Sequence, residues 1–253
     1  MSHLPSLDEL WEAAPPHPAP GVFDPALIRH LPEPARRYLS HAIAPGTPLA
    51  TAVRLRMHGE IKLRQWNPFT AEQVLRWDRG LIWKAKVRMG GHALMTIKGA
   101  DRWIDGEGSM RWKLLGLVPV MSADGPEISR SALGRVQVES FMLPSMLLRE
   151  DVRWSATDDE HPHATVTVGG EHAELALSID EHGALRSIAV RRWGNPEGQA
   201  FHWVDFGGQT SEDRSFGGYT IPTRARVGWY FGSDRWESEG EFFRATIESM
   251  EHR

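Results

Sequence analysis

Apolar and polar residues alternate without interruption from Val53 to Arg64. The apolar side chains of this segment point to one side, and arginine, lysine, glutamate and histidine side chains point to the other. A period of two over twelve residues predicts a β-strand. One polar face is typical of an antiparallel sheet, because parallel sheets are covered on both faces.

Shorter segments with the same alternation, separated by turn-forming residues, occupy most of the remaining chain. They predict about ten or eleven strands in an antiparallel meander, with no βαβ alternation and no repeat of fixed period. Residues 207–222 are glycine-rich, and we expect a loop there. The candidate segments for these strands, besides 53–64, are residues 70–77, 81–88, 92–98, 102–104, 151–157, 164–168, 172–179, 185–193, 199–206, 224–231 and 241–250.

Helical patterns occur at the N-terminus and once in the middle of the chain. The N-terminal ones cover residues 6–14, a segment that starts at Asp24-Pro25, and residues 31–43. The central one covers residues 129–148, with Ser129 as its expected N-cap. Sheets of this width curl or split into two layers. The predicted fold is therefore mainly β (α+β): a large curled antiparallel half-barrel whose N-terminal and mid-chain helices plug its open face.

The segment Asp105–Pro144 interrupts the strand pattern of the chain. It contains two Asp-Gly turns, an apolar run and the central helical pattern. We expect the meander to pause here and to place a helix across its own open face. The predicted domain organisation is an N-terminal arm, residues 1–23, and a single half-barrel domain, residues 24–253.

Composition narrows the classes of function. The chain has 253 residues, no cysteine and a net charge of -4. Disulfides, thiolate zinc sites and cysteine nucleophiles are therefore excluded. The interspersed charges give no basic patch for nucleic acid, so no nucleic-acid partner is expected. The N-terminal residues lack the pattern of a signal peptide and no apolar run reaches about 18 residues. A cytoplasmic protein without an integral membrane segment is expected, as a monomer or homodimer.

Eleven tryptophans are the unusual feature of the composition. Tryptophans bury large areas, either in a core or in the wall of an apolar cavity, and both interpretations stay open here. The candidate ligand-binding residues are Trp83, Trp103, Trp112, Phe141, Met142, His202 and Tyr219.

A second group of candidates could carry chemistry. Arg135 and Glu139 are four residues apart and share one face of the central helix. They are either an exposed ion pair or, in an apolar cavity, an anion-binding group and an acid or base. One of Arg191 and Arg192 must face the interior of a regular strand. The candidate catalytic residues are thus Glu139, Arg135 and Arg192. Motifs for nucleotides, serine hydrolases and metals are missing, so neither a cofactor nor a metal is expected.

Five segments occur in an order that resembles an uncharacterised bacterial family, a domain of unknown function, over about 200 residues from Leu31 onward. They are WKLLGLVPV, GPEISRSALGR, FMLPS, RRWG and FGGYTIPTRARVGWYFG. More loosely, the strand number and helix placement are similar to the bacterial lipoprotein-carrier fold, an eleven-stranded half-barrel whose helices plug an apolar cavity. The resemblance implies a cavity and no particular reaction.

Two functions from different classes follow from these patterns, beside a partner-binding scaffold, which an exposed apolar patch of more than a few hundred Å² would indicate. The first is binding of a small apolar or amphiphilic molecule in the half-barrel cavity. The alternative is a metal- and cofactor-independent enzyme (a hydrolase, lyase or isomerase) that uses the Arg/Glu pair in the same cavity.

Overall fold

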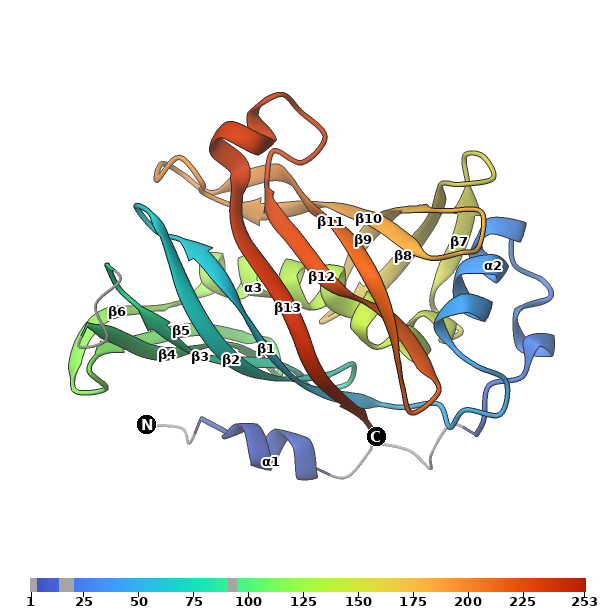
Figure 1. The fold of residues 1–253 in the computed structure, drawn as a ribbon, viewed down its shortest axis with the longest axis horizontal. Helices are drawn as coiled ribbons and strands as arrows, with labels where there is room; N and C mark the ends of the chain where they lie inside the picture. Colours follow the sequence, from blue (N-terminus) through green and yellow to red (C-terminus); the bar gives the residue numbers. More distant parts are fainter. Residues whose placement is uncertain (1–3, 14–20, 91–94) are drawn as a thin grey trace.

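A computed structural model of the chain describes residues 4–13, 21–90 and 95–253. All of its strands belong to one antiparallel sheet (Figure 1). Its strands are β1 (Ala52–Lys62), β2 (Trp66–Arg76), β3 (Gly80–Arg88), β4 (Thr96–Ile104), β5 (Glu107–Leu114), β6 (Val118–Asp124), β7 (Arg153–Ala156), β8 (Pro162–Val168), β9 (Glu171–Ile179), β10 (Leu185–Gly194), β11 (His202–Phe216), β12 (Tyr219–Trp229) and β13 (Glu241–His252).

Two meanders make up this sheet and meet at its centre. The strand order runs from β6 to β1, then to β13, and from there back to β7. The two edges are β6 and β7, which follow one another in the chain. The sheet is therefore curled but not closed, and the mainly β fold expected from the alternation is confirmed.

The connection between the two edges crosses the concave side of the sheet. It consists of α3 (Pro126–Val138) and the 3-10 turns η2 (Glu139–Met142) and η3 (Pro144–Leu148). α3 packs on β4 and β5 of one meander and on β10 of the other (Figure 1). The chain thus crosses its own open face as expected, but only after β6. The first half of the segment Asp105–Pro144 continues the meander as β5 and β6.

The N-terminal helical segments lie at different places on the sheet. α2 (Glu33–Ala42) packs on β7, β8 and β12, and its Tyr38 and Leu39 join the main core. The 3-10 turn η1 (Pro25–Ile28) precedes it, begun by Asp24 as expected. A π-helical turn, η4 (Trp236–Gly240), lies between β12 and β13.

α1 (Leu7–Glu12) differs from the expectation, because it does not plug the open face. Leu10 and Trp11 pack with Val74 and Ile82, which alternate with the residues of the main core and therefore lie on the opposite, convex face. This face carries a small apolar patch of its own, which α1 covers. The boundary of the N-terminal arm at residue 23 stays a prediction, since residues 14–20 lie outside the described chain.

Three expected boundaries were wrong. The turn predicted at Gly99-Ala100 lies inside the continuous strand β4; Gly99 is needed there because a Cβ would lie 2.4 Å from the ring of Trp112. The loop expected from 207 to 222 is the long hairpin β11–β12, with its turn at Gly217-Gly218. Neither difference adds a strand, because the first joins two expected strands and the second lengthens two. β5 and β6, which lie in the segment where we expected the meander to pause, bring the number to thirteen. Residues 91–94, the start of one expected strand, lie outside the described chain.

The third boundary concerns the central helix, expected from 129 to 148. α3 begins earlier, at Pro126, which suits the first helical turn because its missing N–H has no helical partner there. Ser129 lies inside the helix, where its hydroxyl accepts a hydrogen bond from Gly108 N at 2.8 Å. The α-helix ends at Val138, and Pro144 starts a separate 3-10 turn.

Candidate functional site

A cavity of about 420 Å³ lies between the crossing segment and the concave face of the sheet. α3 and η2 form one wall, and strands β1 and β11–β13 form the other. Its lining is mainly aromatic and aliphatic, including Met57, Phe141, Phe206, Val227, Trp229 and Phe243. Partly exposed residues, Leu63, Asn195 and Phe201, line its outer end. The volume falls in the range of about 300–1,000 Å³ that is usual for small-molecule sites.

Arg135 and Glu139 lie in the wall of this cavity and are both engaged by protein partners. The Arg135 Nε donates to one carboxylate oxygen of Glu139, and Gln73 Nε2 donates to the other at 2.6 Å. Arg135 Nη2 also donates to Gln73 Oε1 at 3.1 Å. Gln73 is fully buried. The three side chains form a closed polar network, in which the charges of the arginine and the glutamate neutralise one another.

Asp101 extends this network on the side of β4. Its Oδ1 accepts a hydrogen bond from Trp112 Nε1 at 2.9 Å, and its Oδ2 lies 3.6 Å from Arg135 Nη1. Burial raises the pKa of Asp101, while the positive charge of Arg135 and the tryptophan hydrogen bond oppose that shift. A carboxyl group with a raised pKa in a cavity wall is a candidate proton donor or acceptor.

Arg192 enters the cavity from β10 without an acidic partner. Its Nε donates to Ser131 O at 3.0 Å, and its guanidinium lies over the rings of Phe206 and Trp229, 4.5 and 5.0 Å from their centres. Within the described chain no carboxylate oxygen lies within 4.0 Å of it. Burial, together with the positive charge of Arg135, lowers the pKa of Arg192 to about 9, so the side chain is still charged at neutral pH.

Six of the ten residues expected from the sequence line the cavity. They are Glu139, Arg135 and Arg192 of the catalytic candidates and Trp83, Phe141 and Met142 of the ligand-binding candidates. They come from three distant parts of the chain, which the crossing of α3 and η2 over the sheet brings together.

The other four residues are placed elsewhere. Trp103 is buried in the core beside Gly80 and Gly169, and Trp112 lies behind Trp83, 5.7 Å away between ring centres. His202 begins β11 on the surface, where its ring Nδ1 donates to Ala200 O at 3.1 Å. Tyr219 is part of β12 and not of a loop.

Tyr219 has a structural role that the sequence pattern conceals. Its hydroxyl donates to Pro48 O and accepts from Ala50 N, both at 2.8 Å. Its ring stacks on His252 with 3.9 Å between centres. All polar groups of this tyrosine are thus used to fix the chain segment that leads into β1.

The sequence interpretation missed Asp101 and Gln73 in the cavity wall. Asp101 follows Gly99-Ala100, where the sequence pattern predicts a turn. The strand alternation therefore did not predict that its side chain faces the cavity. Gln73 lies two residues before Leu75 on the inner face of β2, directly opposite Trp83 of β3. A glutamine at an inward strand position is a signal that could have identified it.

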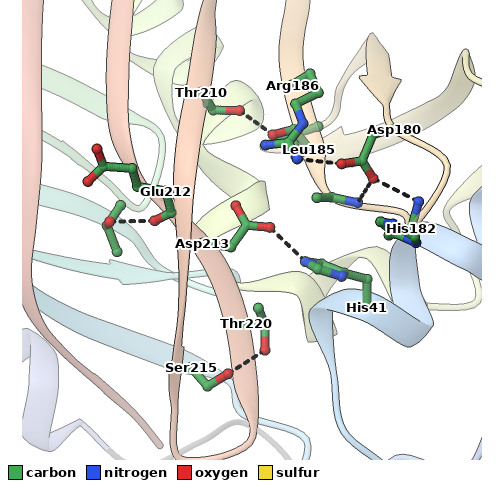
Figure 2. Close-up of polar contacts among 12 residues, drawn as sticks. His41, Asp180, His182, Leu185, Arg186, Thr210, Glu212, Asp213, Ser215 and Thr220 are labelled. Carbon is green, nitrogen blue, oxygen red and sulfur yellow. Dashed lines mark hydrogen bonds and ion pairs between the residues drawn. The ribbon is translucent and has the colours of Figure 1, made fainter.

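A second polar cluster lies away from the cavity, at the junction of α2 with the β10–β12 strands (Figure 2). His41 and Asp213 point toward one another there, with 2.7 Å between Nε2 and Oδ2. Ser215 and Thr220 share a hydrogen bond of 2.7 Å across the β11–β12 hairpin. The first contact fastens α2 to the sheet, and the second joins the two strands of the hairpin.

Comparison with known proteins identifies the family. Residues 29–252 match the model of a family of unknown function, DUF6920. The chain belongs to this family. The uncharacterised family expected from the order of the motifs is thereby confirmed. A search of curated proteins found no match.

Among solved structures, three similar chains are a LolA superfamily protein from Nitrosomonas europaea, a putative outer membrane lipoprotein-sorting protein domain from Vibrio parahaemolyticus and a DUF1329 family protein from Desulfovibrio piger. Their TM-scores are 0.48, 0.40 and 0.36, at 8%, 6% and 11% identity. The similarity covers 87%, 80% and 80% of this chain and 92%, 85% and 86% of those chains.

Proposed function

We propose that the protein binds a small amphiphile, with an apolar body and an anionic head group, in the cavity beneath α3. The observation that carries this proposal is Arg192: a charged guanidinium in an aromatic cavity, without a carboxylate partner in the described chain. The aromatic and aliphatic lining supplies the surface for the apolar body.

The energetics favour an anion at this position. A buried charge is costly unless it is paired, and Arg192 is close enough to Arg135 for their charges to repel. Arg135 forms an ion pair with Glu139. The charges of Glu139 and Asp101 offset part of the cost of the buried Arg192 charge, but neither carboxylate forms an ion pair with it in the described chain. A carboxylate or phosphate group can accept two parallel hydrogen bonds from a guanidinium, and such charge-assisted bonds are about twice as strong as neutral ones.

Titration with a matched pair of ligands tests the proposal. Decanoic acid and decanol have the same chain length and differ in the head group, and quenching of tryptophan fluorescence reports binding. We expect Arg192→Met to weaken decanoate binding by roughly 10- to 100-fold, which corresponds to about 1.5–3 kcal/mol for a charged hydrogen bond. Decanol binding should stay nearly unchanged.

Arg191→Met is the control for this titration, because Arg191 lies on the other face of the same strand and pairs with Asp205 outside the cavity. It should leave both affinities as they are. Equal weakening of both ligands by Arg192→Met, or no weakening, would contradict the role of Arg192. Mass spectrometry of molecules extracted from the purified protein would identify the natural ligand.

A second candidate is a cofactor-independent enzyme that uses the same cavity, and the raised pKa of Asp101 next to the Arg135–Glu139 pair favours it. In this case the molecules extracted from the parent protein and from Asp101→Asn or Glu139→Gln variants should differ, with a product in the first and its precursor in the others. Identical extracts would leave ligand binding as the function. The cytoplasmic location and the oligomeric state expected from the sequence stay predictions.

A further inference from the structure

The β5–β6 hairpin, residues 107–124, presents large apolar side chains to solvent. Their exposed fractions are 57% for Leu115, 79% for Leu117, 58% for Val118, 49% for Val120 and 48% for Met121. β6 is an edge strand, so these side chains have no further strand beside them. Scattered exposed apolar residues are ordinary, but a contiguous group marks an interaction surface.

The tip of the hairpin carries a leucine where the backbone disfavours one. Leu115 and Gly116 have φ values of 52° and 77°, and Leu117 N donates to Leu114 O at 3.0 Å. Such two-residue turns are typical of Asn-Gly or Asp-Gly, because both positions need a positive φ. Leucine adopts this conformation only at a cost in strain. Leu115 adopts an unfavourable backbone conformation while its side chain is exposed to solvent. This combination suggests that the side chain contacts a partner.

A row of lysines lies beside this tip. The protein has five lysines, all between positions 62 and 113. Lys86 is directly opposite Lys98 across β3 and β4, and Lys98 is directly opposite Lys113 across β4 and β5. All three are exposed, and among the described residues none forms an ion pair.

This arrangement is costly in a free protein. Like charges directly opposite one another on a sheet are destabilising, and the protein as a whole has a net charge of -4. Lys84 and Arg88 add to the positive charge on the same face of β3. The concentration of positive charge beside an apolar tip therefore calls for a partner that supplies negative charge and an apolar medium together.

We propose that the β5–β6 hairpin docks on an anionic lipid surface. The leucine and valine side chains of its tip enter the boundary between head groups and acyl chains, and the lysine row lies on the lipid phosphates. Buried apolar area and attraction to anionic lipids are the two contributions that hold peripheral proteins on membranes. A lysine close to such a surface contributes on the order of 1 kcal/mol.

Other occupants fit the surface less well. A second copy of the chain would bring its own lysine row against this one. Addition of a strand to β6 is hindered by Pro119, which cannot donate a hydrogen bond to a new neighbour. Within the described chain no helix is long and apolar enough to cross a bilayer, so contact with lipid would be at the surface.

The hairpin lies at the same end of the sheet as the outer end of the cavity. β1 and β5 run in the same direction, so Leu63 after β1 and Leu115 after β5 lie at one end (Figure 1). With an amphiphile in the cavity, as proposed above, docking would bring the cavity opening to the lipid. Vesicle binding by the hairpin itself does not depend on that ligand.

Flotation with lipid vesicles tests the proposal. The full chain is mixed with vesicles of phosphatidylcholine alone or with added phosphatidylglycerol. We expect binding only to the anionic vesicles, and weaker binding as the salt concentration rises. The triple variant K86Q/K98Q/K113Q should lower the partition coefficient by at least about tenfold, in line with the loss of three charges near the surface.

Leu115→Asn separates lipid contact from folding. Asparagine suits a positive φ better than leucine, so the melting temperature should stay the same or rise. Binding to anionic vesicles should nevertheless fall about tenfold. Leu27→Asn and Arg29→Gln serve as controls: both residues are exposed near η1, beside α2 and far from the hairpin (Figure 1).

Three outcomes would overturn the proposal. The first is no binding to anionic vesicles by the parent protein. The second is binding that Leu115→Asn and the lysine variant reduce no more than the controls do. The third is a dimer in light scattering that Leu115→Asn dissociates, without vesicle binding, because the occupant would then be a second copy.

Discussion

The surroundings of one histidine decide its charge in the folded protein. His252, near the end of β13, is enclosed between Tyr219 and η2. One ring nitrogen lies 3.1 Å from Met142 O, while the other has no partner within the described chain. Burial lowers the pKa of His252 to about 4, and the hydrogen bond to Met142 opposes this only in part. The ring is therefore neutral in the folded protein at neutral pH.

This shift makes folding stability depend on pH. Below an unfolded-state pKa of about 6.5, the unfolded chain binds a proton that the folded chain excludes until about pH 4. Stability is thus complete above pH 6.5 and is lost as pH falls from 6.5 to 4, by at most about 3 kcal/mol. Denaturant unfolding at several pH values should show a flatter dependence for His252→Gln than for the parent. Parallel curves for the two proteins would contradict the assignment of this pH dependence to His252.

Among the secondary-structure elements, those with an uninterrupted alternation were predictable. β1 has no break in its period of two, and its bounds were found almost to the residue. Predictions failed where glycine served packing or extended strand and not a turn. Gly99 makes room for the ring of Trp112, and the Gly-rich segment after Phe206 forms extended strand to Phe216. A single sequence does not distinguish a glycine required by a neighbouring ring from one required by a turn.

The residues of the candidate site were predictable only in part, because some of them meet through contacts between distant segments. Arg135 and Glu139 were found because their spacing belongs to one helix. Asp101 and Gln73 join them through contacts between distant segments, which no local pattern encodes. Arg192 was found by strand alternation, but its lack of an acidic partner depends on which side chains α3 brings opposite it.

The packing of α3 on β10 leads to a prediction at the level of these elements. Gly134 lies against the stem of Arg192, and a Cβ there would lie 2.8 Å from its Cγ. Alanine at position 134 should favour the helix by up to about 1 kcal/mol, but it should displace the arginine. We expect Gly134→Ala to leave stability within about 1 kcal/mol of the parent and to reduce the preference for decanoate over decanol.

Chemical denaturation and the two titrations described above check this expectation. Ser131→Ala is a suitable control, because Arg192 bonds to the backbone oxygen of Ser131 and not to its side chain. An unchanged preference in Gly134→Ala would show that Arg192 does not need its present position.

At the scale of the whole molecule, the two meanders of the sheet are joined at the β1–β13 pair and by the crossing of α3. Gly59 lies in this central pair, opposite Ala245, and a Cβ on it would lie 1.9 Å from Arg244 O. That contact is with backbone, which a rotamer change cannot relieve. Any side chain at position 59 must therefore push β1 and β13 apart.

We expect Gly59→Ala to destabilise the entire protein, by at least about 2 kcal/mol, and to do so in one cooperative transition. Arg56→Ala, an exposed position of the same strand, should change stability by less than about 0.5 kcal/mol. Calorimetry distinguishes the alternatives. If Gly59→Ala instead splits unfolding into two transitions, each meander has a stability of its own, and the crossing helix is a lid on an independent sheet. If a single transition moves to lower temperature, the central pair and the crossing helix hold one cooperative unit together, and the cavity between them exists only while both are in place.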